Sequence, residues 1–206
     1  MSVITFPADN SCVVEKFTFG QKRQDILFRS SFGSQATEIS SPLWEASISA
    51  PTNYENVSGP WQALIMKLKG QVNQLALWNL GRPMPLGTMR GAMTLSSSAA
   101  QGATTLVVTA GSGQASKTLK VGDFVGVGTG TTTQLLMIMA DATANGSGVI
   151  SLTVEPPLRN AFASSSVVTW DKPCALFRRS DSKSDWEYSI NMASGFNLNL
   201  IEDVRP

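Results

Sequence analysis

The residues that could carry acid–base chemistry in this chain are its carboxylates, because the sequence contains no histidine. Histidine is the commonest general base and metal ligand, so its absence removes a Ser-His-Asp triad and most zinc sites. Asp123, Asp141, Glu155 and Asp171 each stand at the end of an expected strand. Glycoside hydrolysis needs two carboxylates that face each other across a cleft, and nothing in the sequence pairs two of these. We expect the acids to cap turns, and we predict a protein that is not an enzyme and has no catalytic residues.

A glycine-rich stretch, Gly126 to Thr131 (GVGTGT), suggests a phosphate-binding loop at first sight. The dinucleotide-binding pattern requires a third glycine where Thr131 stands, and a helix should follow it. The residues that follow, TTQLLMIM, have no helical period. We therefore predict two strands and their connecting loop, with no bound nucleotide or other cofactor.

The two cysteines, Cys12 and Cys174, are far apart in the sequence and form no CxxC pair. They indicate neither a disulfide framework nor a metal site, and small buried side chains are the simplest interpretation. This favours folding in a reducing, intracellular compartment. No apolar run approaches the ~20 residues that a membrane span needs, so we expect no membrane partner.

The tryptophans are the remaining residues that could bind a ligand, since aromatic rings can line a sugar platform. Two of the five, Trp44 and Trp61, fall at positions that should face a core, and core is the better interpretation for most of them. A carbohydrate-binding module remains the alternative hypothesis, with Trp170 as its test residue. The five are Trp44, Trp61, Trp78, Trp170 and Trp186.

The composition favours a protein that other subunits cover. Of 206 residues, 42% are hydrophobic and 15% are charged, and the net charge is +1. A usual charged share is about 25%, so much of the surface must consist of neutral polar residues. Such a balance gives no basic footprint for sequence-specific nucleic-acid binding. The length allows one large domain or two small ones.

The first stretch, up to residue 91, mixes strands with one short helix. We predict strands within 12–20, 25–33, 43–51 and 73–81. In the third of these, Trp44, Ala46 and Ile48 alternate with polar residues. Between the strands predicted in 43–51 and 73–81, apolar residues at i, i+3, i+4 and i+7 predict a helix that begins at Pro60 and ends before Gly70.

The stretch 92–173 is all β by pattern, and the stretch from 174 onward returns to a mixed composition. Five or six short strands separated by Gly-, Ser- and Thr-rich turns predict a small closed barrel, which also removes exposed edges. After Cys174 we expect a strand, a solvated turn around Ser180 to Ser184 within the run LFRRSDSK, and a final alternating strand (Phe196, Leu198, Leu200). The expected barrel strands lie in 93–98, 104–111, 123–128, 134–142, 149–157 and 166–173.

The order of these features resembles the distal tail proteins of long-tailed siphophages. The helix GPWQALIMKLKG comes first, followed by GRPMPLG and then by a barrel that contains LKVGDFVGVG, LLMIMADA and LTVEPPLR. The return strand CALFRRSDS and the terminal GFNLNLIEDV complete the pattern. The similarity is to the two-domain kind, in which an oligonucleotide/oligosaccharide-binding-type (OB-like) barrel is inserted into a ring-forming domain.

The resemblance implies a mainly β fold, with a β-sandwich-like ring domain that includes one short helix (1–91 and 174–206) and an inserted OB-like barrel (92–173). It implies a homohexameric ring at the virion tail tip, assembled in the host bacterial cytoplasm. The ring would join the tail tube protein to the hub and tip proteins of the baseplate. It would leave a channel for the tape-measure protein and for DNA. No family motif is catalytic, so no catalytic, cofactor-binding or metal residues are transferred; another tail tube or tail-completion component is a further alternative.

Overall fold

The computed structural model describes residues 2–9, 11–190 and 192–204. It is mainly β, with 47% strand and 9% helix, and its described residues contain one α-helix and a closed six-stranded antiparallel barrel. The predicted fold class is thus confirmed. The chain divides into two compact units, and each is described by itself. The first unit comprises residues 1–22, 43–77 and 176–206, and the second comprises residues 23–42 and 78–175.

The first unit is built on a six-stranded sheet in the order β1-β5-β14-β17-β3-β2. The final strand β17 keeps the predicted alternation, because Leu198 and Leu200 are buried while Asn197 and Asn199 are exposed. β1 had no prediction, and it lies parallel to β5. The strands are β1 (Val3–Thr5), β2 (Lys16–Ser30), β3 (Gly33–Ser49), β5 (Gln74–Trp78), β14 (Cys174–Arg179) and β17 (Asn197–Glu202).

Helix α1 (Glu55–Leu68) packs the predicted apolar stripe into the core of the first unit, since Trp61, Leu64, Ile65 and Leu68 are all buried. It begins five residues before Pro60, so the prediction that proline opens the helix is wrong. A proline inside a helix removes its own N–H bond to the residue four positions earlier and crowds the carbonyl of that residue, and here the packed stripe keeps the helix continuous. The end agrees with the prediction: the chain leaves the helix through left-handed residues, with φ of +64° at Gly70.

A small three-stranded sheet lies in the same unit, formed by β15 (Glu187–Ser189), β16 (Met192–Ser194) and β4 (Asn53–Tyr54). The turn that precedes it holds an unexpected buried cation. Arg179 has only 4% of its side chain exposed, and it donates hydrogen bonds to Asp181 (2.6 Å), to Ser184 (2.7 Å) and to the Lys183 carbonyl oxygen. The prediction that this basic run is a solvated turn is therefore wrong for Arg179, which fixes the turn from inside.

The barrel forms the main part of the second unit, with strand order β10-β12-β7-β6-β13-β9 closing on itself. Its interior is apolar: Leu106, Val108, Val125, Leu136 and Leu152 have no exposed surface. The pair β8 (Thr118–Leu119) and β11 (Ala142–Thr143) lies outside the closed set. The barrel strands are β6 (Met93–Leu95), β7 (Thr105–Thr109), β9 (Phe124–Val127), β10 (Gln134–Ile138), β12 (Val149–Glu155) and β13 (Val167–Thr169).

The segments that enter and leave the barrel run side by side. The Lys172 N–H donates to the Pro83 carbonyl oxygen at 2.8 Å, and the Trp170 indole donates to the Gly91 carbonyl oxygen at 2.8 Å. The Arg90 guanidinium lies 5.2 Å from the centre of the Trp170 ring. These contacts close the inserted segment at its base.

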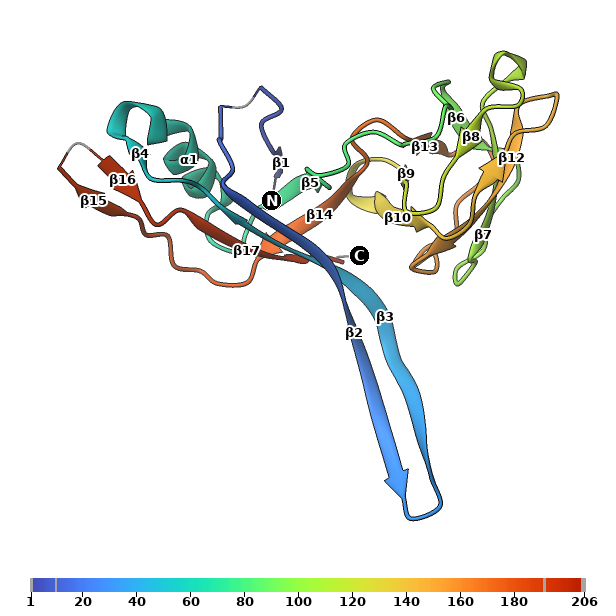
Figure 1. The fold of residues 1–206 in the computed structure, drawn as a ribbon, viewed down its shortest axis with the longest axis horizontal. Helices are drawn as coiled ribbons and strands as arrows, with labels where there is room; N and C mark the ends of the chain where they lie inside the picture. Colours follow the sequence, from blue (N-terminus) through green and yellow to red (C-terminus); the bar gives the residue numbers. More distant parts are fainter. Residues whose placement is uncertain (1, 10, 191, 205–206) are drawn as a thin grey trace. The chain divides into compact units, whose positions relative to one another are not determined.

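The most visible departure from the sequence-based prediction is a long hairpin arm, defined here as residues 23–42 (Figure 1). We predicted separate strands in 12–20 and 25–33. Instead β2 runs unbroken from Lys16 to Ser30 and turns directly into β3 at Gly33, and Cys12 is outside any strand. Gly20 does not interrupt the strand, because its φ is not positive and a Cβ there would meet nothing within 4 Å.

Candidate functional site

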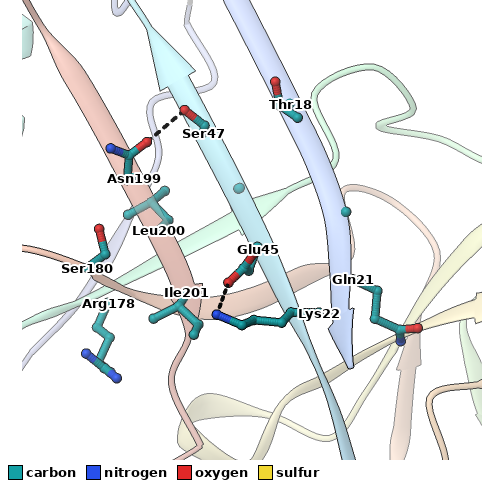
Figure 2. Close-up of a pocket in the computed structure, with 12 residues that line it drawn as sticks. Thr18, Gln21, Lys22, Glu45, Ser47, Arg178, Ser180, Asn199, Leu200 and Ile201 are labelled. Carbon is teal, nitrogen blue, oxygen red and sulfur yellow. Dashed lines mark hydrogen bonds and ion pairs between the residues drawn. The ribbon is translucent and has the colours of Figure 1, made fainter. Parts of the chain in front are cut away.

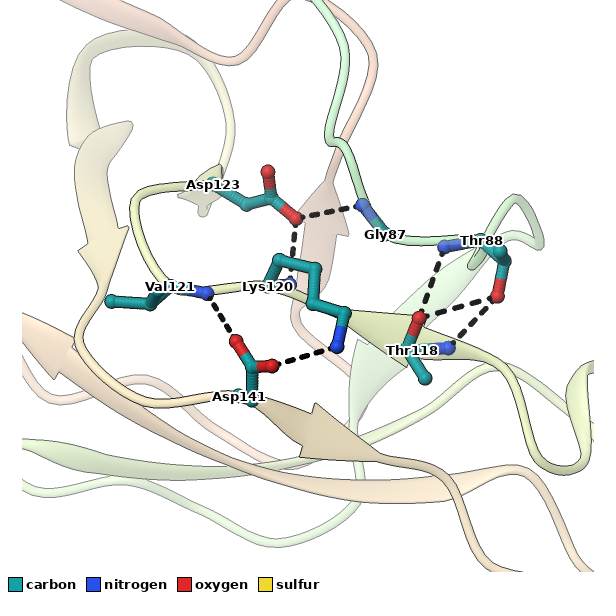
Figure 3. Close-up of polar contacts among 7 residues, drawn as sticks. All are labelled: Gly87, Thr88, Thr118, Lys120, Val121, Asp123 and Asp141. Carbon is teal, nitrogen blue, oxygen red and sulfur yellow. Dashed lines mark hydrogen bonds and ion pairs between the residues drawn. The ribbon is translucent and has the colours of Figure 1, made fainter.

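The buried acid Asp123 is a structural anchor. Its side chain is fully buried at the start of β9. One carboxylate oxygen accepts the Leu86 N–H (2.7 Å). The other accepts the N–H groups of Gly87 (3.1 Å) and Lys120 (2.7 Å), as Figure 3 shows. Buried carboxylates need such donors to replace lost water. Asp123 thus fastens the entering segment to the barrel.

Lys120 to Asp123 form a turn, and Asp141 lies on the other side of this turn from Asp123. The Asp141 side chain is exposed. It accepts a hydrogen bond from Lys120 Nζ at 2.6 Å and one from the Val121 N–H at 2.9 Å (Figure 3). The side-chain hydrogen bond from Lys120, followed by the backbone one from Val121, lowers the pKa of Asp141 below its ordinary value. Asp123 and Asp141 therefore flank one turn with separate donors, and they do not face each other across a cleft.

The other two acids are also apart from this turn. Glu155, at the end of β12, pairs with Arg23 Nη2 of the arm at 2.6 Å. Asp171 lies exposed in the segment that leaves the barrel. The expectation that these acids serve turns and strand ends describes Asp123 and Asp141 well, whereas it misses the ion pair of Glu155.

The glycine-rich stretch, Gly126 to Thr131, forms the end of β9 and most of a short 3₁₀ turn (Gly130–Thr132), and β10 begins just after it at Gln134. The two strands pair in antiparallel fashion, with Val127 opposite Gln134 and Val125 opposite Leu136. Gly128 and Gly130 have φ of +90° and +61°, which a tight turn requires and which glycine adopts without strain. The predicted pair of strands with a connecting loop is confirmed.

Three of the tryptophans lie in the cores, as predicted for Trp44 and Trp61: these two and Trp78 are buried. Trp186 stacks on Phe196, with 6.1 Å between ring centroids. Trp170 has one ring face under the Arg90 guanidinium and its indole N–H bonded to Gly91. A sugar platform needs an open ring face and free neighbouring polar groups, so these contacts disfavour Trp170 as one.

Both cysteines have thiols whose pKa burial raises to about 11. Cys12 is buried and Cys174 is partly buried. Within residues 2–9, 11–190 and 192–204, no group of three or more Cys, Asp or Glu side chains is arranged to hold a metal ion. In the same described residues, no helix is both long enough and apolar enough to cross a membrane.

A depression of about 490 Å³ lies on the polar side of the first unit's sheet (Figure 2). Its charges are already compensated: Lys22 pairs with Glu45 at 3.3 Å, and Arg178 lies 3.8 Å from Asp203. Among the uncharged groups, the Ser47 hydroxyl donates a hydrogen bond to Asn199 Oδ1 at 2.9 Å. The pocket therefore offers a neutral, hydroxyl- and amide-rich surface without an unpaired charge to select a ligand. It is lined by Thr18, Gly20, Gln21, Lys22, Glu45, Ala46, Ser47, Arg178, Ser180, Asn199, Leu200 and Ile201.

The arm carries five large exposed apolar side chains. Phe32 at its turn is 99% exposed, and Phe28 and Ile39 are each 59% exposed. Ile26 and Leu27 follow at 44% and 48%. Exposed apolar residues are ordinary when scattered, but a cluster of this kind marks an interaction site. The arm is therefore the strongest candidate for a functional surface.

The two faces of the arm differ in chemistry, because successive side chains of a strand point to opposite faces. Arg23 and Glu38 share one face, since their side chains form an ion pair at 3.2 Å. Alternation along β2 places Ile26 and Phe28 on the face opposite to Arg23. Alternation along β3 places Ile39 on the face opposite to Glu38, which is therefore the same face as Ile26 and Phe28. We call this opposite side the neutral face. It contains no charged residue: by the same alternation its members are Ile26, Phe28 and Ser30 of β2 and Gln35, Thr37, Ile39 and Ser41 of β3. Gln24 is left out of this set, because its side chain accepts a hydrogen bond at 3.1 Å from Ser40, which alternation places on the Glu38 face.

Among the residues that the structure describes, β2 is also the last strand in the order of its sheet, so one of its sides has no described strand next to it. An edge strand presents unpaired backbone N–H and C=O groups that can pair with another chain. The alternation of DILFRSSFG is the sequence signal for this site. It does not show that the hairpin extends past the other strands of the sheet.

No protein-family model matches the chain, and no curated protein sequence matches it.

Proposed function

We propose that the protein is a structural virion protein, which assembles with copies of itself into a ring at the distal end of a long non-contractile phage tail. The hexameric number, the tail tube, hub and tip partners, and the channel for the tape-measure protein and DNA come from the family resemblance. The OB-like character of the barrel comes from the same resemblance. The observation that carries self-association is the exposed, two-faced arm.

The arm gains stability if another surface packs against it. A two-stranded hairpin is marginal in water without a surface to pack against. The arm leaves Ile26, Phe28 and Ile39 exposed along its neutral face. Packing this face against another protein would remove apolar surface from water at ~25 cal/mol per Å².

A second copy of the chain is the occupant that we favour. The neutral face buries no unpaired charge when it meets another neutral surface, and burying such a charge would cost several kcal/mol. The chain as a whole is suited to this, with 15% charged residues. The β2 edge adds backbone groups that pair with any strand, whatever its sequence. A head-to-tail contact whose rotation closes gives a ring.

The glycan-binding alternative has less support, because Trp170 is engaged by Arg90 and Gly91. An enzymatic function has no constellation in its favour among the described carboxylates.

The test is the state of association of the purified protein, measured by native mass spectrometry and by electron microscopy of negatively stained particles. We expect oligomers that are rings with a central hole. A protein that stays monomeric at all concentrations up to the millimolar range would refute self-association. Discrete oligomers without a hole would refute the ring.

A matched pair of variants links the association to the neutral face. Ile26 and Leu27 are neighbours with similar exposure, 44% and 48%, on opposite faces of β2. We expect Ile26→Gln to weaken association by about tenfold at each interface, the factor that loss of ~1.4 kcal/mol of apolar contact gives. Leu27→Gln should leave it close to wild type. Equal effects of the two substitutions would show that the neutral face is not the contact.

A further inference from the structure

Arg23 joins the root of the arm to the barrel. Arg23 directs Nη1 to Glu38 across the hairpin (3.2 Å) and Nη2 to Glu155 at the end of β12 (2.6 Å). Both partners are carboxylates, so one guanidinium holds two strands of the arm and one corner of the barrel together. A guanidinium is suited to this because its donors form a rigid fork.

The surroundings extend this contact beyond one ion pair. Pro42 is the last residue of the arm, so it also lies at the root of the hairpin, and it is buried. With Pro157 and the segment 38–41, it lines a depression of about 270 Å³. Pro157 follows Glu155 by two residues, so the same barrel corner meets the root of the arm twice.

We propose that the Arg23 fork is a clasp that fixes the orientation of the arm on the barrel before a second copy binds. Arg23 and Glu38 lie on the face opposite the neutral face, so the clasp holds the arm by its charged side. The neutral face with Ile26 and Phe28 stays open for the partner. Arg23 and Glu155 are thus positioning residues, and the part of this inference that concerns the partner rests on the proposed function.

The clasp acts by reducing the conformational freedom of the free subunit. A segment that is already oriented loses less entropy on binding, so association is faster and tighter for the same contacts. An exposed ion pair alone adds little to stability, and Glu155 and Arg23 are 26% and 46% exposed. Breaking the clasp should therefore change the orientation of the arm far more than the melting temperature.

The direct test measures the distance between spin labels on the arm and on the barrel by pulsed electron paramagnetic resonance. Labels are placed at Ser31→Cys in the arm turn and at Gln101→Cys on the barrel, in a Cys174→Ala background under conditions where the subunit is monomeric. We expect one narrow distance distribution for the parent protein. Glu155→Gln should broaden it at least twofold without a change in melting temperature. A distribution that is unchanged by Glu155→Gln would overturn the clasp.

Two further variants separate the clasp from a general effect of removing charge. Asp141→Asn breaks an ion pair of the same length, 2.6 Å to Lys120, at a place that does not involve the arm. It should leave the distribution narrow. The charges are exchanged in Arg23→Glu/Glu155→Arg with Glu38→Gln added, because a carboxylate at position 23 would otherwise face Glu38. This exchange should restore most of the narrowing that Glu155→Gln removes, and failure to do so would count against a direct pair.

Assembly kinetics give the readout that depends on the proposed function. We expect Glu155→Gln to slow ring formation by roughly tenfold, which corresponds to ~1.4 kcal/mol of lost preorganisation. If the wild-type protein does not associate at all, the proposed function fails while the distance measurement still tests the clasp. If Glu155→Gln broadens the distance distribution but does not slow association, the clasp exists but does not serve assembly, and the proposal is overturned.

Discussion

Replacing Asp123 should destabilise the barrel more than any other single loss of a carboxylate. Its two oxygens accept N–H groups from Leu86, Gly87 and Lys120 at 2.7, 3.1 and 2.7 Å, and the side chain is fully buried. Asp123→Ala removes all three acceptor contacts and leaves the donors partly buried without a partner. A hydrogen bond to a charged group contributes about 1.5–3 kcal/mol, and an orphaned buried donor costs about 1–3 kcal/mol.

Because water can enter and replace some of these contacts, we expect a net loss of about 3–5 kcal/mol in the free energy of unfolding for Asp123→Ala. For a unit of ~100 residues this lowers the melting temperature by more than ~10 °C. Asp123→Asn keeps the volume and one acceptor oxygen, and it should fall between the wild type and the alanine variant. The change is measured by urea and thermal unfolding followed by circular dichroism, with amide exchange at Leu86 and Gly87 as a local reporter.

Asp141→Asn is the control, since Asp141 lies beside the same turn but is exposed to solvent. Its melting temperature should stay close to that of the wild type. The reasoning would be refuted if Asp123→Ala melted within ~2 °C of the wild type, or if the two substitutions had equal effects.

Three further outcomes are expected. Trp61→Phe should lower the free energy of unfolding by about 1–3 kcal/mol in urea titrations, because the buried indole donates to the Val13 carbonyl oxygen at 3.0 Å; no change would contradict this contact. The pKa of the Cys12 and Cys174 thiols is raised from 9.0 to about 11, so the unfolded chain loses these protons first, and stability should fall as pH rises from about 9 to 11. Urea titrations at both pH values should show a smaller fall in the Cys12→Ala/Cys174→Ala variant, and an equal fall would refute a role for the thiols. Phe32→Ser should leave the melting temperature unchanged, because the side chain is 99% exposed; a measurable loss would show that the turn packs against something in the free chain.

The parts of the fold that the sequence predicted are those whose pattern is local. The apolar stripe of α1 and the alternation around Leu198 depend on residues a few positions apart, and both are present. The barrel followed from short β-rich runs with regular turns. The ends of the elements were predicted less accurately, and α1 is the example, because it starts before Pro60. Packing of its apolar stripe outweighs the hydrogen bond that the proline removes.

The parts that were missed depend on contacts between distant residues. The arm requires β2 and β3 to stay paired beyond the body of the sheet, and a pattern cannot show where that body ends. The anchor at Asp123 joins residues 36 and 37 positions apart, and the ion pair of Arg23 with Glu155 spans 132 positions. The acid Asp123 was recognised as belonging to a turn, but its partners could not be named. Arg179 was assigned to solvent, since its neighbours are charged and polar.

The closure of the barrel's base has a consequence for how such a chain can be rebuilt. The Lys172 N–H reaches the Pro83 carbonyl oxygen, so the points at which the inserted segment begins and ends are one hydrogen bond apart. A module whose ends meet can be excised or exchanged by joining the host chain with a short turn, without stretching what remains. The barrel is thus a natural cassette, and hybrids that carry a different small domain between residues 83 and 172 should keep the remaining sheet intact.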